Sequence, residues 1–171
     1  MSAIPGALSA FLERLELVEL PSLRRDVELV RARWDRELRR YADVYPELRR
    51  IEPLLDRLLA ELEQHLKLEE QVIFPEIRML ERRGRSVGAL QSPLLTLTWS
   101  NAHLSALQKA ICRHLIPGSR PSSLESAFRY LGCFLERLQG YLEIEISVLV
   151  AEAARLERET PRVRPASPDL I

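Results

Sequence analysis

The chain has 171 residues, enough for one domain with a sizeable core, and its 25 Lys and Arg balance its 25 Asp and Glu. This balance argues against a nucleic-acid interface, which needs clustered basic charge, and no apolar run approaches the ~20 residues of a membrane span. The N-terminus lacks a basic start followed by an apolar core, so no secretory signal is expected. Cys112 and Cys133 have neither metal-site spacing nor the number for a disulfide framework, so we expect free thiols and a cytoplasmic protein.

The chain is rich in Leu, Glu and Arg and poor in Gly and aromatic residues, which favours helices over sheet. Its first element is a short amphipathic segment over residues 8–20, which we expect to stop at Pro21. Residues 1–21 therefore form an N-terminal helical segment. It is either a lid or the first part of the first bundle helix.

Four longer amphipathic helices follow. The first begins after Ser22, and its apolar positions recur every three or four residues: Leu23, Val27, Val30, Trp34, Leu38 and Tyr41. The second spans about 47–83 and carries the stripe Leu58, Leu62, His65, Glu69, Val72 and Glu76. We expect Pro53 and Pro75 to kink or interrupt it, because each lacks a backbone donor.

Two loops and two further helices complete the pattern. Residues 82–93 form a loop rich in Gly and Arg, a third helix covers about 93–115, and turn residues at 116–123 end it. The fourth helix begins near Leu124. The tail 161–171 contains three prolines and is expected to be disordered. The sequence thus predicts an all-α, up-down-up-down four-helix bundle over 22–160, preceded by the short N-terminal helix.

A weak internal repeat links the second and fourth helices. Residues 64–77 and 140–153 align without gaps and share four identities: Leu66 with Leu142, Glu69 with Glu145, Val72 with Val148, and Glu76 with Glu152. The repeated acid on an apolar stripe is the informative feature, because burial of an unpaired carboxylate costs several kcal/mol.

Glu69 and Glu145 would repel each other in a core unless one binds a proton or both share a cation. His65 lies one helical turn before Glu69, close enough to bind the same ion, and His103 can point toward them from the third helix. A bundle can bring such residues to one level and bind a metal there.

Plainer interpretations stand beside this one. A His and a Glu four residues apart often form a surface hydrogen bond, Glu145 could lie on a solvated face, and His103 could be an ordinary core histidine. His114 lies eleven residues after His103, about 16 Å along the axis, and is interpreted as a cation at the helix C-terminus.

At HLKLEEQVIFP (65–75) the sequence resembles hemerythrin-like proteins, in which a His and a Glu one turn apart precede an apolar stretch ending in Phe-Pro. The preceding residues resemble the iron–sulfur-cluster-repair branch of that family. The resemblance implies a four-helix bundle with a non-haem di-iron centre. Matched by position, His65 and Glu69 correspond to the second-helix ligands, His103 to the third-helix His and Glu145 to the fourth-helix carboxylate.

Two family positions do not match. Tyr141 replaces the fourth-helix His and could bind Fe(III) as a phenolate or be an ordinary core tyrosine. The first-helix His is absent, because no His precedes His65, and Trp34 is a candidate to fill its space. The ligand set is therefore degenerate, with two of the family's four imidazoles missing.

Three functions remain open. The first is a metal-binding protein holding one or two Fe ions, or Zn, at His65, Glu69, His103, Glu145 and Tyr141, with O2 or NO as candidate ligands and a role in stress response or cluster repair. The second is a metal-free bundle with a structural or regulatory partner, and a homodimer is a candidate assembly. The third, which we favour least, is a di-iron oxidase or peroxidase.

Overall fold

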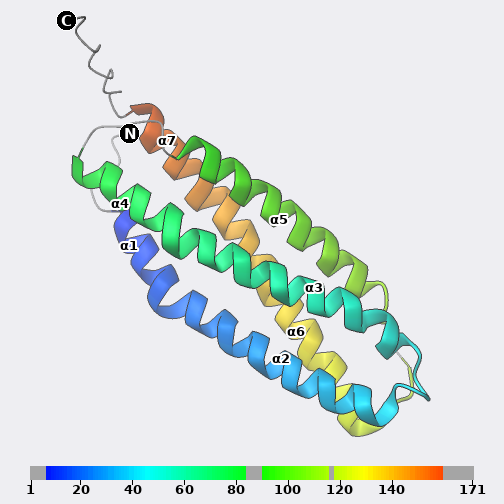
Figure 1. Ribbon diagram of the computed structural model, residues 1–171. Helices are drawn as coiled ribbons and strands as arrows, with labels where there is room; N and C mark the ends of the chain where they lie inside the picture. The colour runs from blue at the N-terminus through cyan, green and yellow to red at the C-terminus, as the bar shows by residue number, and fades with distance from the viewer. Residues whose placement is uncertain (1–6, 84–89, 116–117, 160–171) are drawn as a thin grey trace, which may run out of the picture.

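The computed structural model describes residues 7–83, 90–115 and 118–159. These residues form four long helices, each running most of the length of the molecule (Figure 1). The first comprises α1 (Ala7–Arg14), η1 (Leu15–Glu19) and α2 (Leu20–Tyr41), and the second comprises α3 (Glu47–Leu68), η2 (Glu69–Ile73) and α4 (Phe74–Arg83). The third is α5 (Gln91–Cys112), and the fourth comprises α6 (Ser122–Ile144), η3 (Glu145–Val150) and α7 (Ala151–Glu159). The segments η1, η2 and η3 are π-helical.

The four long helices pack as a closed ring. Contacts join α2 to α3, α3 to α5, α5 to α6, and α6 back to α2. At the other end of the molecule α4 contacts α1 and α7. The predicted all-α bundle is therefore confirmed. Within the described part of the chain, no helix is long and apolar enough to span a membrane.

The N-terminal segment is the first part of the first long helix, because α1, η1 and α2 follow one another without a break. The expectation that Pro21 stops this helix is wrong. Pro21 lies inside the continuous first long helix, directly after η1, and Pro53 lies inside an uninterrupted α3.

The wide turns of η1 and η2 explain how the helices pass their prolines. Leu20 N–H bonds to Leu15 O, and Phe74 N–H bonds to Glu69 O, which is the i to i−5 pattern of a π turn. Pro21 and Pro75 follow immediately. A proline ring clashes with the carbonyl four residues earlier in a regular α-helix, and the wider turn relieves that clash. In η3 the equivalent position is Ala151, so no proline accounts for the third π segment.

The wide turns also change which residues face the core. After Glu69 the fully buried apolar residues include Ile73, Phe74 and Ile77, whereas the expected Val72 and Glu76 are only partly buried. In the fourth helix Leu149 and Ala153 are buried in the same way, and Val148 is exposed. A turn that takes more residues than an α turn delays the next core position.

The core is dominated by leucine from all four long helices. Its largest fully buried side chains include Phe74, Phe134, Leu58, Leu62 and Ile77. The predicted loop residues 84–89, residues 116–117 and the predicted disordered tail 161–171 lie outside the described residues. The division into 1–21, 22–160 and 161–171 stays a prediction.

Candidate metal centre

Two glutamates lie in the dry interior of the bundle. Glu69 is the first residue of η2 and is 0% exposed, and Glu145 is the first residue of η3 and is 1% exposed. The two equivalent positions of the internal repeat therefore open the π segments of the second and fourth long helices. π turns inside α-helices frequently occur at functional sites, which directs attention to these carboxylates.

His65 lies between the two carboxylates. Its Nε2 is 2.9 Å from Glu145 Oε2 and 3.8 Å from Glu69 Oε2, and its Nδ1 is 3.0 Å from Ser100 Oγ. An ionised carboxylate can only accept, so Nε2–H donates to Glu145 while Ser100 Oγ–H donates to Nδ1. The other tautomer of His65 is also compatible with the Ser100 contact, because Nδ1–H can then donate to Ser100 Oγ. This leaves the Nε2 lone pair free. The hydroxyl thus fixes the ring orientation in both states.

Each carboxylate has one further partner. The Tyr141 hydroxyl lies 2.5 Å and 2.6 Å from the two oxygens of Glu69, to which it donates. Asn101 Nδ2 donates to Glu145 Oε2 over 3.0 Å. The other oxygen, Glu145 Oε1, is buried and has no hydrogen-bond partner. A buried, unpartnered carboxylate oxygen is costly and calls for a ligand.

The electrostatics of the cluster disfavour two bare carboxylates. Burial, and then the neighbouring charge of Glu145, raise the pKa of Glu69 well above its ordinary value, although the Tyr141 hydrogen bond opposes this. Burial and the two acids raise the pKa of Tyr141 as well, which keeps its hydroxyl protonated. A cation between the carboxylates would offset both the repulsion and the desolvation.

The structure brings four of the five sequence-predicted residues together: His65, Glu69, Glu145 and Tyr141. One ligand atom from each of His65, Glu69 and Glu145 can be chosen so that all three lie within 4.8 Å of one another. Among the described residues these form the single group of three or more His, Cys, Asp or Glu side chains with that spacing. An imidazole nitrogen and carboxylate oxygens suit Fe and Zn, so the donor set fits a transition-metal ion.

The structure separates His103 from this cluster. Its side chain is 44% exposed, its Nδ1 lies 2.6 Å from Glu61 Oε2, and its Nε2 lies 3.2 Å from an Arg57 nitrogen. The physical reason is helical phase. The buried face of α5 follows Leu97, Asn101 and Leu104, and His103 points away from it.

Trp34 does not fill the space of the missing first-helix ligand. Its ring packs 5.6 Å from that of Phe128. Phe128 precedes Tyr141 by thirteen residues, which is about 20 Å along a helix axis. At the level of Tyr141 the first long helix supplies Leu15, Glu19 and Leu23 instead. His114 follows the end of α5, where its predicted role as a C-terminal cation stays a prediction.

Ser100 and Asn101 hold His65 and Glu145 in place, and the sequence did not predict either residue in the site. A signal for Asn101 was present, because Leu97, Asn101, Leu104, Gln108 and Ile111 recur at helical spacing and all are buried. A polar residue on that stripe needs a polar partner inside the bundle. The sequence favoured His103 instead, because an imidazole is a common metal ligand.

One comparison with known proteins gives a match. The Hemerythrin HHE cation binding domain matches residues 22–92, less than half of the chain. No curated protein and no solved structure matches the sequence. The matched range contains His65 and Glu69, whereas Tyr141 and Glu145 lie beyond it. The match therefore supports a hemerythrin-type, cation-binding domain in a chain that brings a His/Glu/Glu cluster together inside a helical bundle.

Proposed function

We propose that this protein binds one transition-metal ion, iron or zinc, through His65 Nε2, Glu69 and Glu145. The observation that carries the proposal is the compact donor set, with ligand atoms within 4.8 Å and Glu145 Oε1 buried without a partner. One ion fits better than two. His65 is the single imidazole of the cluster, because His103 faces Glu61 on the surface and His114 follows the far end of α5.

Tyr141 acts in this proposal as a positioning residue. Its hydroxyl donates to both oxygens of Glu69 and so holds that carboxylate toward His65. Ser100 has the same role for His65, because its hydroxyl accepts from Nδ1–H when Nε2 is free to bind an ion. Asn101 orients Glu145. If Tyr141 were instead a ligand of Fe(III), the loaded protein would show a visible phenolate band that Tyr141→Phe removes.

Iron would supply coordination positions for a small molecule such as O2 or NO. With that chemistry the protein would serve in the response to oxygen, nitric oxide or oxidative stress, or in iron–sulfur cluster repair. The family resemblance at residues 65–75, and in the residues that precede them, supports this finer role, and the buried donor set is compatible with it.

Metal analysis tests the proposal. Protein purified without chelators is loaded with Fe(II) under anaerobic conditions or with Zn(II), freed of excess metal by gel filtration and analysed by elemental mass spectrometry. We expect about one ion per chain, as for a single site with N and O donors. His65→Ala and Glu145→Gln should lose the ion, and His114→Ala should retain it. Equal retention by His65→Ala and His114→Ala would refute the assignment.

A second function is favoured by a specific observation. The hydrogen bonds from Tyr141 to Glu69 and from His65 and Asn101 to Glu145 leave one orphan carboxylate oxygen, so the cluster is nearly satisfied without an ion. In that case the bundle is a metal-free structural or regulatory protein. Absence of bound metal after both loadings would favour this alternative.

A further inference from the structure

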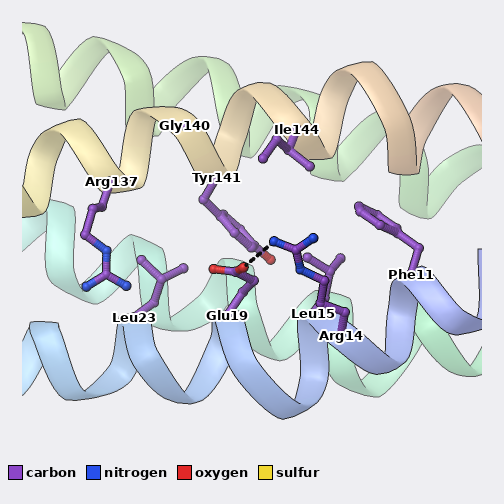
Figure 2. Close-up of a pocket in the computed structure, with 9 residues that line it drawn as sticks. All are labelled: Phe11, Arg14, Leu15, Glu19, Leu23, Arg137, Gly140, Tyr141 and Ile144. Carbon is purple, nitrogen blue, oxygen red and sulfur yellow. Dashed lines mark hydrogen bonds and ion pairs between the residues drawn. The ribbon is translucent and has the colours of Figure 1, made fainter.

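A cavity of about 290 Å³ lies beside the cluster, between the first long helix and α6 (Figure 2). Phe11, Leu15, Leu23 and Ile144 give it an apolar lining. Polar side chains also line it, among them the ion pair of Arg14 with Glu19. Its volume is several times the ~30 Å³ that a water molecule occupies, so it has room for a small molecule.

Tyr141 belongs to both the cavity and the cluster. Its ring lines the cavity, reaching from α6 toward the first long helix in Figure 2, and its hydroxyl donates to both oxygens of Glu69. Only 6% of the residue is exposed. One aromatic side chain therefore separates the cavity from a carboxylate of the proposed metal centre.

Gly140 helps to keep this space open. It lines the cavity, and a Cβ atom built on it would meet no heavy atom within 4 Å. Glycine inside an α-helix is less favourable than almost any other residue, so its presence in α6 has a cost in stability. A side chain at this position would project into a space that is now open.

We propose that this cavity is the port through which a small uncharged molecule of the size of NO or O2 reaches the buried centre, with Tyr141 as its gate. The inference rests on the proposed function, since the centre at the end of the port is the His65, Glu69 and Glu145 site. The apolar part of the lining, which adjoins Tyr141, favours an uncharged molecule, because an ion would lose its hydration there. Its volume of about 290 Å³ lies at the lower end of the range of ligand pockets, which suits a small molecule.

The chain offers a matched pair of variants for the test. Gly140→Leu fills the port. Gly132→Leu makes the same change eight residues earlier in α6, where a Cβ also meets nothing within 4 Å and the residue does not line the cavity. Both changes replace a helical glycine with a better helix former, so both variants are expected to fold.

The experiment measures NO binding to the Fe(II)-loaded proteins by stopped-flow absorbance, after metal analysis of each sample. We expect equal metal content in all three proteins. The association rate of Gly132→Leu should equal that of wild type, and that of Gly140→Leu should fall at least about tenfold, the factor that ~1.4 kcal/mol of added barrier gives. Equal rates in both variants at equal metal content would overturn the port.

A second readout does not depend on the metal. Xenon binds apolar cavities, and its occupancy can be measured in crystals of the metal-free proteins under xenon pressure. We expect xenon between Tyr141 and Leu15 in wild type and Gly132→Leu, and none there in Gly140→Leu. Xenon at this place in all three proteins would contradict the inference. If wild type fails to bind metal, the proposed function is refuted, and the metal content of the sample shows this directly. The xenon result tests the cavity independently of that outcome.

Discussion

Replacing His65 with alanine is expected to abolish the stabilisation that a metal ion gives to this protein, whereas replacing His103 is expected to leave it intact. The two side chains differ in their surroundings. His65 is 1% exposed with Nε2 between two carboxylates, and His103 is 44% exposed in contact with Glu61 and Arg57. The pair distinguishes the site seen in the structure from the larger ligand set that the sequence predicts.

The size of the effect follows from mass action. A ligand that binds only the folded state stabilises it by RT ln(1 + [L]/Kd), which is about 2.7 kcal/mol at a free-metal concentration of ~100 Kd. For a chain of this length, 1 kcal/mol corresponds to about 2–4 °C in Tm, so the expected shift is about 5–10 °C. Removing the sole imidazole of the cluster should reduce the shift of His65→Ala to near zero.

Differential scanning calorimetry with and without metal measures the shift for wild type and both variants. The metal-induced change in Tm is the quantity compared, because loss of buried hydrogen bonds also lowers the Tm of metal-free His65→Ala. A shift that persists in His65→Ala, or one that disappears in His103→Ala, would refute the geometry on which the assignment rests.

Three further predictions concern stability, each measured by urea unfolding of the metal-free protein. Tyr141→Phe leaves the buried Glu69 carboxylate without its donor and should cost about 1.5–3 kcal/mol; an unchanged unfolding midpoint would contradict this. Asp26→Ala removes the acceptor shared by Tyr130 and Arg137 and should lower the free energy of unfolding by about 1–3 kcal/mol. The loss is limited because Arg137 is half exposed and water compensates in part. A loss no larger than that of an alanine substitution at an exposed position would count against the network. Phe74→Ala empties a fully buried position and should cost about 3–5 kcal/mol, whereas Leu95→Ala, at an exposed position, should stay within ~0.5 kcal/mol; similar losses in the two would exclude the packing described.

The helices and their order could be predicted because each long helix carries an apolar stripe with helical spacing. In α2 the buried residues Leu23, Val30 and Trp34 belong to the predicted stripe. The unbroken first helix could not be predicted in the same way. Proline usually ends a helix, and nothing local indicates that a wide turn over Leu15–Glu19 lets the chain continue past Pro21.

The candidate site was predictable where a polar residue interrupts a leucine stripe, as at His65, Glu69 and Glu145. All three are buried and adjacent in the structure. The error at His103 has a different source, because its chemistry suggested a ligand while its position relative to Leu97 and Leu104 places it on the outer face of α5. Helical phase is the better guide there, and it points to Asn101.

Buried polar residues far from the cluster mark the limit of that reasoning. Glu37 is 3% exposed and accepts from Ser123 across the bundle, and Gln108 donates to Leu135 O. Each pair joins two different helices of the bundle. Their partners depend on how the helices are rotated against each other, which single-helix periodicity does not determine.

The π turn that begins at Glu145 also affects where the chain could tolerate the deletion of one residue. A π turn holds one residue more than an α turn. Deletion of one residue within 146–149 would therefore restore a regular α-helix. The residues before and after the deletion would still direct the same side chains into the core. The same deletion beside Pro21 or Pro75 would press a proline ring against backbone carbonyl groups. A one-residue deletion is therefore expected to lower the stability of the protein least in the fourth helix.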